Sequence, residues 1–218
     1  MDEPTAEPPD AVPRRKPPRA VRELVETIGL ALAIYFGVQM LVPPYAVDGA
    51  SMTPNLRDGE RLLVNRSVYA HFDANRVLNL LPGVERVGEA LFFPFHSPER
   101  GEIVVFDPPR ATGKPYIKRV IGLPGDELAF ADGYVTIDGE RLDEPYLSGP
   151  ITDCDGSPHC RVMVPAGTVY VLGDNRDNSS DSRRFGPVAV DRIIGKAWLA
   201  NWPLDAVGVI PGVDYGDD

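Results

Sequence analysis

Tyr116-Ile-Lys-Arg-Val-Ile-Gly-Leu-Pro-Gly-Asp126 is a run of β-branched and aromatic residues that passes directly into a turn rich in Gly and Pro. Such a run is typical of a short β-strand followed by a tight turn. Successive side chains of a strand point to opposite faces, so Lys118 and Arg119 are expected on different faces. We therefore predict a strand that carries an amine on one side and a guanidinium on the other.

Six further segments have the same character and are bounded by Gly, Pro, Asp or Asn, which predicts short strands. They are residues 61–65, 102–106, 134–138, 161–164, 168–172 and 193–199. Asp138-Gly139 predicts a two-residue hairpin turn between residues 134–137 and 140–142. The 23 Pro and 21 Gly in 218 residues disfavour a helical bundle. The predicted fold is mainly β, an antiparallel β-sheet or barrel.

The N-terminal part of the chain has a different composition. Residues 1–20 contain six Pro and few large apolar side chains, which predicts a disordered tail over residues 1–23. Residues 28–42 are then apolar apart from Gln39. Counted from residue 24, this run approaches the roughly 20 residues that cross a bilayer. Pro43-Pro44 should end the helix.

Three interpretations of this apolar run were compared. A buried core helix would show a polar face, and residues 28–42 show none. A cleaved signal peptide fits the basic flank, but Pro44-Tyr45-Ala46 is a poor small-x-small cleavage site. A retained single-pass anchor over residues 24–42 fits best. The basic flank then stays in the cytoplasm, and residues 43–218 form an extracytoplasmic domain at the inner (plasma) membrane, with the lipid bilayer as a partner.

Candidate chemistry is carried by a few polar residues in the β-rich part. Val47-Asp-Gly-Ala-Ser-Met-Thr-Pro-Asn-Leu56 places Ser51 in a constrained turn, although serine in such a turn is commonly only a turn residue. Lys118 stands out because the chain has 18 Arg and four Lys. Lysine can lose its proton, whereas arginine cannot. His71, His96 and His159 have no motif around them, so a serine hydrolase would need a Ser–Lys pair.

Two other groups admit more than one reading. Gly173-Asp-Asn-Arg-Asp-Asn-Ser-Ser-Asp-Ser-Arg-Arg-Phe-Gly186 is either a solvated loop or a calcium site, but the spacing of a calcium loop with a closing Glu is absent. Cys154 and Cys160 favour a small loop disulfide outside the cytoplasm. Two free thiols remain an alternative, and a zinc site with His159 has too few ligands.

The net charge of −10 argues against nucleic acid as a partner.

These segments, in this order after an apolar run, resemble signal peptidase I, the membrane-anchored leader peptidase family. The resemblance rests on Ser-Met-x-Pro at 51–54, Arg-Gly-Glu-Ile-Val-Val-Phe at 100–106, Ile-Lys-Arg-Val-Ile-Gly-Leu-Pro-Gly-Asp at 117–126, and Gly-Asp-Asn-Arg-Asp-Asn-Ser-x-Asp-Ser-Arg at 173–183. It implies a mainly β, membrane-bound serine endopeptidase without a cofactor. Its partners would be preprotein signal peptides, cleaved after a small-x-small motif, close to the secretion translocon.

The resemblance also implies roles for individual residues. Ser51 would be the nucleophile and Lys118 its general base. Ser179 would hydrogen-bond the lysine, and Asp181 would pair with Arg183 and Arg119 behind the site. Apolar pockets for the small residues before the scissile bond are implied at Tyr45, Val47, Met52, Leu56, Tyr116 and Ile117.

Four features depart from the family pattern or are harder to interpret. Gly49 stands where some members have a serine in the oxyanion hole, so the Ser51 N–H and a neighbouring backbone group would have to stabilise the oxyanion. Asn55 replaces the usual Thr. The accessory domain should be reduced to a small hairpin cap around residues 127–172. Within residues 67–97, the apolar stretch 91–95 is expected to be a loop tucked onto the core, with insertion into the outer leaflet as the alternative.

Two rival functions make different sequence demands. A Ser–Lys self-cleaving regulator of the repressor type would carry a DNA-binding module in place of a bilayer-length apolar run. A membrane-anchored calcium-binding or scaffold protein would explain the acidic loop but would leave Lys118 unexplained. We therefore expect the peptidase.

Overall fold

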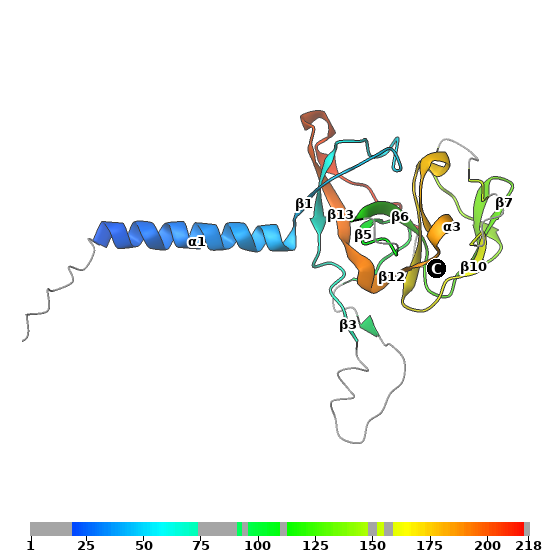
Figure 1. Cartoon of the computed structure of the whole chain (residues 1–218), viewed down its shortest axis with the longest axis horizontal. Coiled ribbons are helices and arrows are strands. Elements are labelled where there is room, and N and C mark those ends of the chain that lie inside the picture. Colours follow the sequence, from blue (N-terminus) through cyan, green and yellow to red (C-terminus); the bar gives the residue numbers. More distant parts are fainter. Residues whose placement is uncertain are drawn as a thin grey trace, which may run out of the picture. The chain divides into compact units, whose positions relative to one another are not determined.

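The computed structural model describes residues 19–73, 91–92, 96–109, 113–147, 152–154 and 159–215 (Figure 1). The chain divides into two compact units, Met1–Val38 and Gln39–Asp218. The first contains most of a long helix and the second contains the β-sheets.

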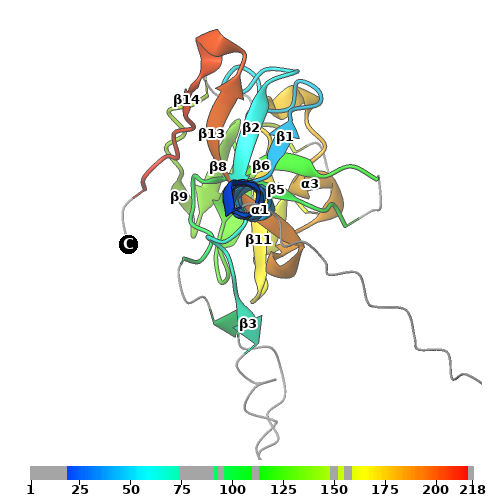
Figure 2. The same cartoon turned by 90° about the vertical axis from the view of Figure 1, so that its left-hand side faces the viewer.

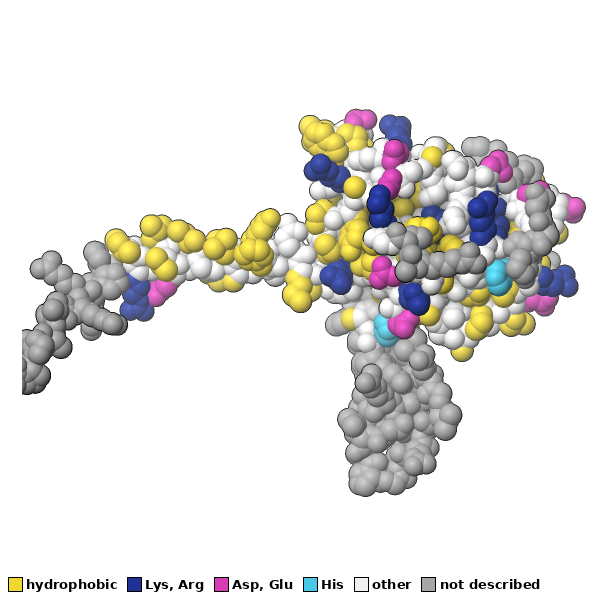
Figure 3. All heavy atoms as spheres, viewed as in Figure 1, with side chains coloured by type: hydrophobic (Ala, Val, Ile, Leu, Met, Phe, Trp, Pro, Cys, Tyr) yellow, Lys and Arg dark blue, Asp and Glu magenta, His cyan; other side chains and the backbone are white. Residues whose placement is uncertain are grey.

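Helix α1 spans Arg19–Leu41. It is long and apolar enough to cross a membrane. Figure 3 shows apolar side chains along most of its length, with charged side chains gathered toward its N-terminal end. The helix begins earlier than the predicted anchor, because Arg19 pairs with Glu23 and Arg22 with Glu26 at the spacing that stabilises a helical turn. Residues 19–23, predicted as disordered tail, are therefore helical, and residues 1–18 lie outside the described part.

The largest sheet has eight strands, in the order β1-β2-β13-β5-β6-β11-β12 with β14 paired to β13 (Figure 2). Their bounds are β1 Pro44–Ala46, β2 Arg61–Asn65, β5 Ile103–Phe106, β6 Tyr116–Gly122, β11 Thr168–Leu172, β12 Val188–Ala189, β13 Ile193–Trp202 and β14 Gly208–Val209. Every pairing between neighbouring strands is antiparallel. The mainly β, antiparallel fold predicted from the sequence is confirmed.

A second sheet covers part of this body, and its strands β7 and β10 are labelled in Figure 1. Its strands are β7 Glu127–Ala131, β8 Tyr134–Ile137, β9 Glu140–Arg141 and β10 Arg161–Met163, in the order β10-β7-β8-β9. The predicted hairpin cap is thus a four-stranded sheet. The hairpin turn itself is confirmed, since Ile137 pairs with Glu140 and both Asp138 and Gly139 have positive φ, as a type I′ turn requires.

Two short strands, β3 Phe72–Asp73 and β4 Leu91–Phe92, pair within the region that the sequence left unassigned. Residues 91 and 92 are therefore a strand and not a loop. The predicted packing of the apolar stretch 91–95 lies outside the described side chains.

Strand β6 is buried on both faces, and this burial positions the site. Val120 packs in one core cluster with Val104 and Phe106, whereas Ile121 packs beneath the second sheet with Leu128. Charged side chains on the same strand must therefore lie among apolar neighbours.

Candidate active site

Ser51 and Lys118 come together from two distant parts of the chain. Ser51 lies in the turn between β1 and β2, and Lys118 lies in β6. The Lys118 amine donates to Ser51 Oγ at 2.7 Å and to the Ile117 carbonyl oxygen at 2.8 Å. Lys118 is 4% exposed. The pair therefore places a hydroxyl next to an amine that has almost no access to water.

Burial lowers the pKa of Lys118 to about 8, because the charged amine loses its hydration. The carboxylates of Asp181 and Asp174 oppose this effect and raise the pKa, but the effect of burial is larger. A neutral amine, able to accept a proton, is consequently accessible near neutral pH.

The turn that carries Ser51 is held from the polar loop 173–186. The Asn175 N–H donates to the Ser51 carbonyl at 3.0 Å, and its side-chain amide donates to the Ala50 carbonyl at 3.0 Å. At Gly173, an added Cβ would overlap Ser179 Oγ and lie 2.5 Å from the Ser51 carbonyl oxygen. The two loops can approach this closely because residue 173 has no side chain. Sequence reasoning noted the polar run but gave no role to Gly173 or Asn175.

Close to Ser51 and Lys118 in sequence or in the sheet lie two buried ion pairs. Arg183 donates to both carboxylate oxygens of Asp181 at 2.9 Å, as expected. Arg119, however, pairs with Asp174 at 2.9 and 2.8 Å. The expected pairing of Arg119 with Asp181 is wrong, because Asp174 follows closely after the end of β11, the strand next to β6 in the sheet. Because Asp174 and Asp181 each already bind an arginine, these two aspartates are poor ligands for calcium.

Ser179 does not form the expected contact with Lys118. It is 8% exposed, and its Oγ has no hydrogen-bond partner among the described residues. Instead the hydroxyl lies against Gly173. Its predicted hydrogen bond to Lys118 is not formed in this structure.

An apolar cleft of about 250 Å³ leads to Ser51 and Lys118. Of the predicted substrate contacts, Tyr45, Val47, Tyr116 and Ile117 line this cleft. Met52 and Leu56 do not line it. The Leu56 N–H bonds to the Met52 carbonyl in a helix-like turn, which directs both side chains into the core beside Leu62.

Six cleft residues were not predicted from the sequence. They are Ala46, Asp48, Leu62, Val105, Pro115 and Ser180. Asp48 and Ser180 are close in sequence to motif residues and could have been included on that basis. Leu62 and Val105 reach the cleft through the pairing of distant strands, which sequence alone does not specify.

Gly49 is held in a conformation that favours glycine, with φ of +93°. Its N–H donates to Asp58 Oδ1 at 2.8 Å. Since this N–H is already used, it is a poor donor for an oxyanion. The Ser51 N–H is therefore the better candidate for that role.

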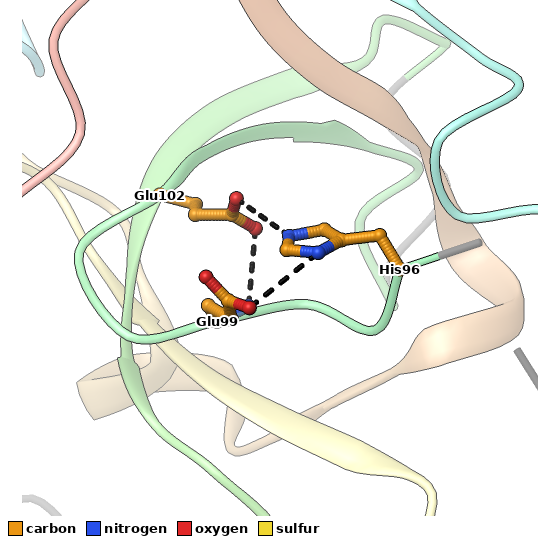
Figure 4. A group of neighbouring side chains, drawn as sticks. All are labelled: His96, Glu99 and Glu102. Atoms are coloured by element: carbon orange, nitrogen blue, oxygen red, sulfur yellow. Dashed lines mark hydrogen bonds and ion pairs between the residues drawn. The ribbon is translucent and has the colours of Figure 1, made fainter. Parts of the chain in front are cut away.

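One cluster has the composition of a metal site: His96, Glu99 and Glu102, whose ligand atoms lie within 4.8 Å of one another (Figure 4). Glu102, however, already accepts hydrogen bonds from the Tyr69 hydroxyl and the Lys196 amine. Burial favours a higher pKa for Glu102, but these hydrogen bonds together lower it. Because the Lys196 ammonium already supplies a cation here, we interpret the cluster as an internal ion pair.

A disulfide joins Cys154 and Cys160. Next to it, the Asp153 carbonyl accepts a hydrogen bond from Arg183 at 2.9 Å. The residue that precedes the disulfide therefore contacts the arginine that pairs with Asp181.

A serine hydroxyl beside a buried amine, at the end of an apolar cleft, is the arrangement expected of a serine hydrolase that uses lysine. Comparison with known families agrees with this class. Residues 21–202 match the family model described as signal peptidase, peptidase S26.

The sequences of two relatives support the same assignment. Signal peptidase I of Leptolyngbya laminosa is 34% identical over 95% of this chain and 94% of its own length. Signal peptidase IB of Staphylococcus aureus is 32% identical over 85% of this chain and 92% of its own length. A crystal structure of a signal peptidase I from Enterococcus faecalis is 34% identical, covers 46% of this chain and 96% of that chain, and gives a TM-score of 0.42. The chain belongs to the signal peptidase family, peptidase S26, and is a serine endopeptidase.

Proposed function

We propose that this protein is a membrane-anchored endopeptidase that removes signal peptides from preproteins after a small-x-small motif, with Ser51 as nucleophile and Lys118 as general base. The single observation that carries the proposal is the 2.7 Å contact between Lys118 Nζ and Ser51 Oγ. Without a buried amine, the Ser51 hydroxyl would have no base beside it.

The chemistry follows from this pair. Neutral Lys118 takes the proton of Ser51 as Oγ attacks the scissile carbonyl carbon. The Ser51 N–H stabilises the oxyanion that forms. The protonated amine then gives its proton to the leaving amino group, and the peptide C–N bond breaks. Lys118, neutral again, removes a proton from water as the water attacks the acyl carbon. The bond between that carbon and Ser51 Oγ then breaks, the protonated amine returns the proton to Oγ, and the acid product leaves.

The cleft supports the specificity for small residues. It is short, with a volume of about 250 Å³, and Tyr45, Val47 and Ile117 are among its walls. Small side chains can enter such apolar walls, whereas bulky ones would clash. The scissile bond would then be the one that follows the last small residue.

Helix α1 supports the anchor and the location of the substrate. We place residues 1–23 in the cytoplasm, the anchor within α1, and residues 43–218 outside the inner membrane. Translocated signal peptides would then reach the cleft beside the translocon, while still held in the bilayer.

The test is cleavage of a purified preprotein by the full chain in lipid vesicles. We expect wild type to cleave after Ala-x-Ala but not after Phe-x-Phe in the same preprotein. Ser51→Ala and Lys118→Arg should both be inactive, with circular dichroism spectra like that of wild type. Guanidinium keeps the charge of lysine but cannot accept the serine proton. Substantial cleavage by Lys118→Arg would show that another group is the base.

A further inference from the structure

A second cavity, of about 360 Å³, lies apart from the cleft and shares no lining residue with it. It is bounded by the turn that follows Ser51, by Arg119 of β6 and by residues 205–213 near the C-terminus. About half of its surface is apolar, and Leu56, Ile103 and Ile210 contribute to that half. Its size is within the range of small-molecule sites.

Glu60 lines this cavity and is 6% exposed. Its backbone is fully used: its N–H donates to Arg57, and its carbonyl accepts from Val47. Its carboxylate, in contrast, has no hydrogen bond or ion pair with any residue in the described part of the chain. Buried acids are usually paired, so a side chain this little exposed is an unusual place for an unpaired carboxylate.

The other buried acids in the described residues are all paired. Asp174 bonds Arg119, Asp181 bonds Arg183, and Glu102 bonds Lys196. Glu60 is therefore the exception among them, and it lines the cavity.

The remaining polar groups around the cavity are already occupied or exposed. The Arg119 guanidinium bonds Asp174 and the Gly101 carbonyl. The Tyr146 hydroxyl donates to Glu144. Arg57 and Asp205 are exposed and carry opposite charges. The one buried polar group open to a ligand is thus an acceptor with a negative charge.

We propose that this cavity binds a small organic cation: a primary ammonium group on a short apolar stem. The ammonium would bond the Glu60 carboxylate, giving it the charged partner that the chain lacks. The stem would contact Leu56, Ile103 and Ile210. A divalent metal ion fits less well, because it needs several oxygen ligands and Glu60 supplies the only buried carboxylate.

The test uses n-butylammonium as the probe and the full chain in lipid nanodiscs, with binding measured by saturation-transfer NMR. Glu60→Gln keeps the shape of the side chain and removes its charge. We expect this variant to bind n-butylammonium at least about tenfold more weakly than wild type does. This is the loss of affinity expected when one charge-assisted hydrogen bond is removed. Asp205→Asn is the matched control, since it removes an exposed acid from the same cavity, and it should bind like wild type.

Two further measurements make the result decisive. Neutral n-butanol should bind wild type at least tenfold more weakly than the cation does. Ala206→Leu, which leaves Glu60 in place and fills the cavity with apolar bulk, should also abolish binding. Cleavage of preprotein reports whether each variant is folded. Three outcomes would each overturn the proposal and leave the peptidase assignment untouched. Wild type and Glu60→Gln could bind the cation equally, or wild type could bind n-butanol as well as it binds the cation. Wild type could also fail to bind the cation at millimolar concentration.

Discussion

Burial of a single amine links the stability of this protein to its activity. The pKa of Lys118 falls from its ordinary value of 10.5 to about 8 because β6 places the amine among apolar neighbours. The charged form is therefore disfavoured in the folded chain and not in the unfolded chain. Both activity and the free energy of unfolding should therefore decrease as pH falls, for the same reason.

Activity should rise with pH through about 8, the pKa of Lys118. Below that pH, kcat/KM should fall about tenfold for each pH unit, because one proton must be lost from the base. Stability should depend on the same group. As pH falls from 10.5 to about 8, the unfolded chain takes up the proton first, so the free energy of unfolding decreases; below 8 the loss is complete.

The checks are a pH profile of kcat/KM and urea unfolding of wild type and Lys118→Met across the same pH range. The stability change between pH 8 and 10.5 should be absent in Lys118→Met, which has no amine to protonate. A kcat/KM profile with its midpoint near 6 would indicate a histidine and contradict the assignment.

Gly173 gives a second prediction at the scale of one residue. A Cβ at this position would overlap Ser179 Oγ and lie 2.5 Å from the Ser51 carbonyl oxygen. Gly173→Ala should therefore displace Ser51 from Lys118 and lower kcat at least tenfold, since a shift of about 1 Å has a large effect on catalysis. Gly208→Ala is the control, because its Cβ would meet nothing within 4 Å. If both variants cleave like wild type, close approach of the two loops is not required.

At the scale of elements, the loop 173–186 and helix α3 Ser182–Phe185 hold the surroundings of Lys118, the proposed base. Asp181 caps α3 by accepting from the Arg183 N–H, and it also accepts from the Gly173 N–H at 3.1 Å. One carboxylate thus joins the helix, its arginine and the segment that holds Ser51. Its charge also raises the pKa of Lys118 against the effect of burial.

Asp181→Asn should lower both stability and the pH midpoint of activity. The buried Arg183 loses its charged partner, which we expect to cost about 3 kcal/mol of unfolding free energy. Without the negative charge, the Lys118 pKa should drop, and the rise of kcat/KM should move below pH 8. Asp177→Asn, an exposed acid in the same loop, should change neither quantity. A stability loss with an unmoved pH midpoint would show that Asp181 does not act on the lysine.

Local sequence patterns predicted where strands lie better than they predicted which strands and side chains pair. Residues 61–65 and 168–172 were predicted as strands and match β2 and β11. Strand β7 was missed, because Glu127–Ala131 lacks the β-branched residues that marked the other strands. Which aspartate meets Arg119 depends on how β6 lies beside β11, a pairing between segments about 50 residues apart.

The same limit applies to the candidate site. The motifs identified Ser51 and Lys118, because their neighbours in sequence are distinctive. Met52 and Leu56 were predicted in the cleft, but a helix-like turn points both into the core. Turn geometry of this kind depends on contacts with the rest of the fold and cannot be derived from spacing alone.

At the scale of the whole molecule, the chain divides into a unit up to Val38 and a unit from Gln39 onward. The second unit contains all the strands and both residues of the proposed pair. The described residues of the first unit, Arg19 onward, contain no buried side chain. Their large apolar side chains, such as Leu30 and Phe36 at 64% exposure each, therefore need an apolar environment that the described part of this unit does not supply.

We expect that environment to be the bilayer. The full chain should stay in membranes washed with alkaline carbonate and dissolve only with detergent, whereas a chain lacking residues 1–42 should be recovered without detergent. A sharper comparison keeps the length of the chain: Leu32→Arg with Phe36→Arg puts two charges in the middle of α1. Each charge costs about 2.5–3.5 kcal/mol at the centre of a membrane helix, so this variant should be released by carbonate while the second unit remains intact. Recovery of wild type in a soluble fraction without detergent would contradict the spanning assignment. Retention of the double-Arg variant would show that another part of the chain holds it to the membrane.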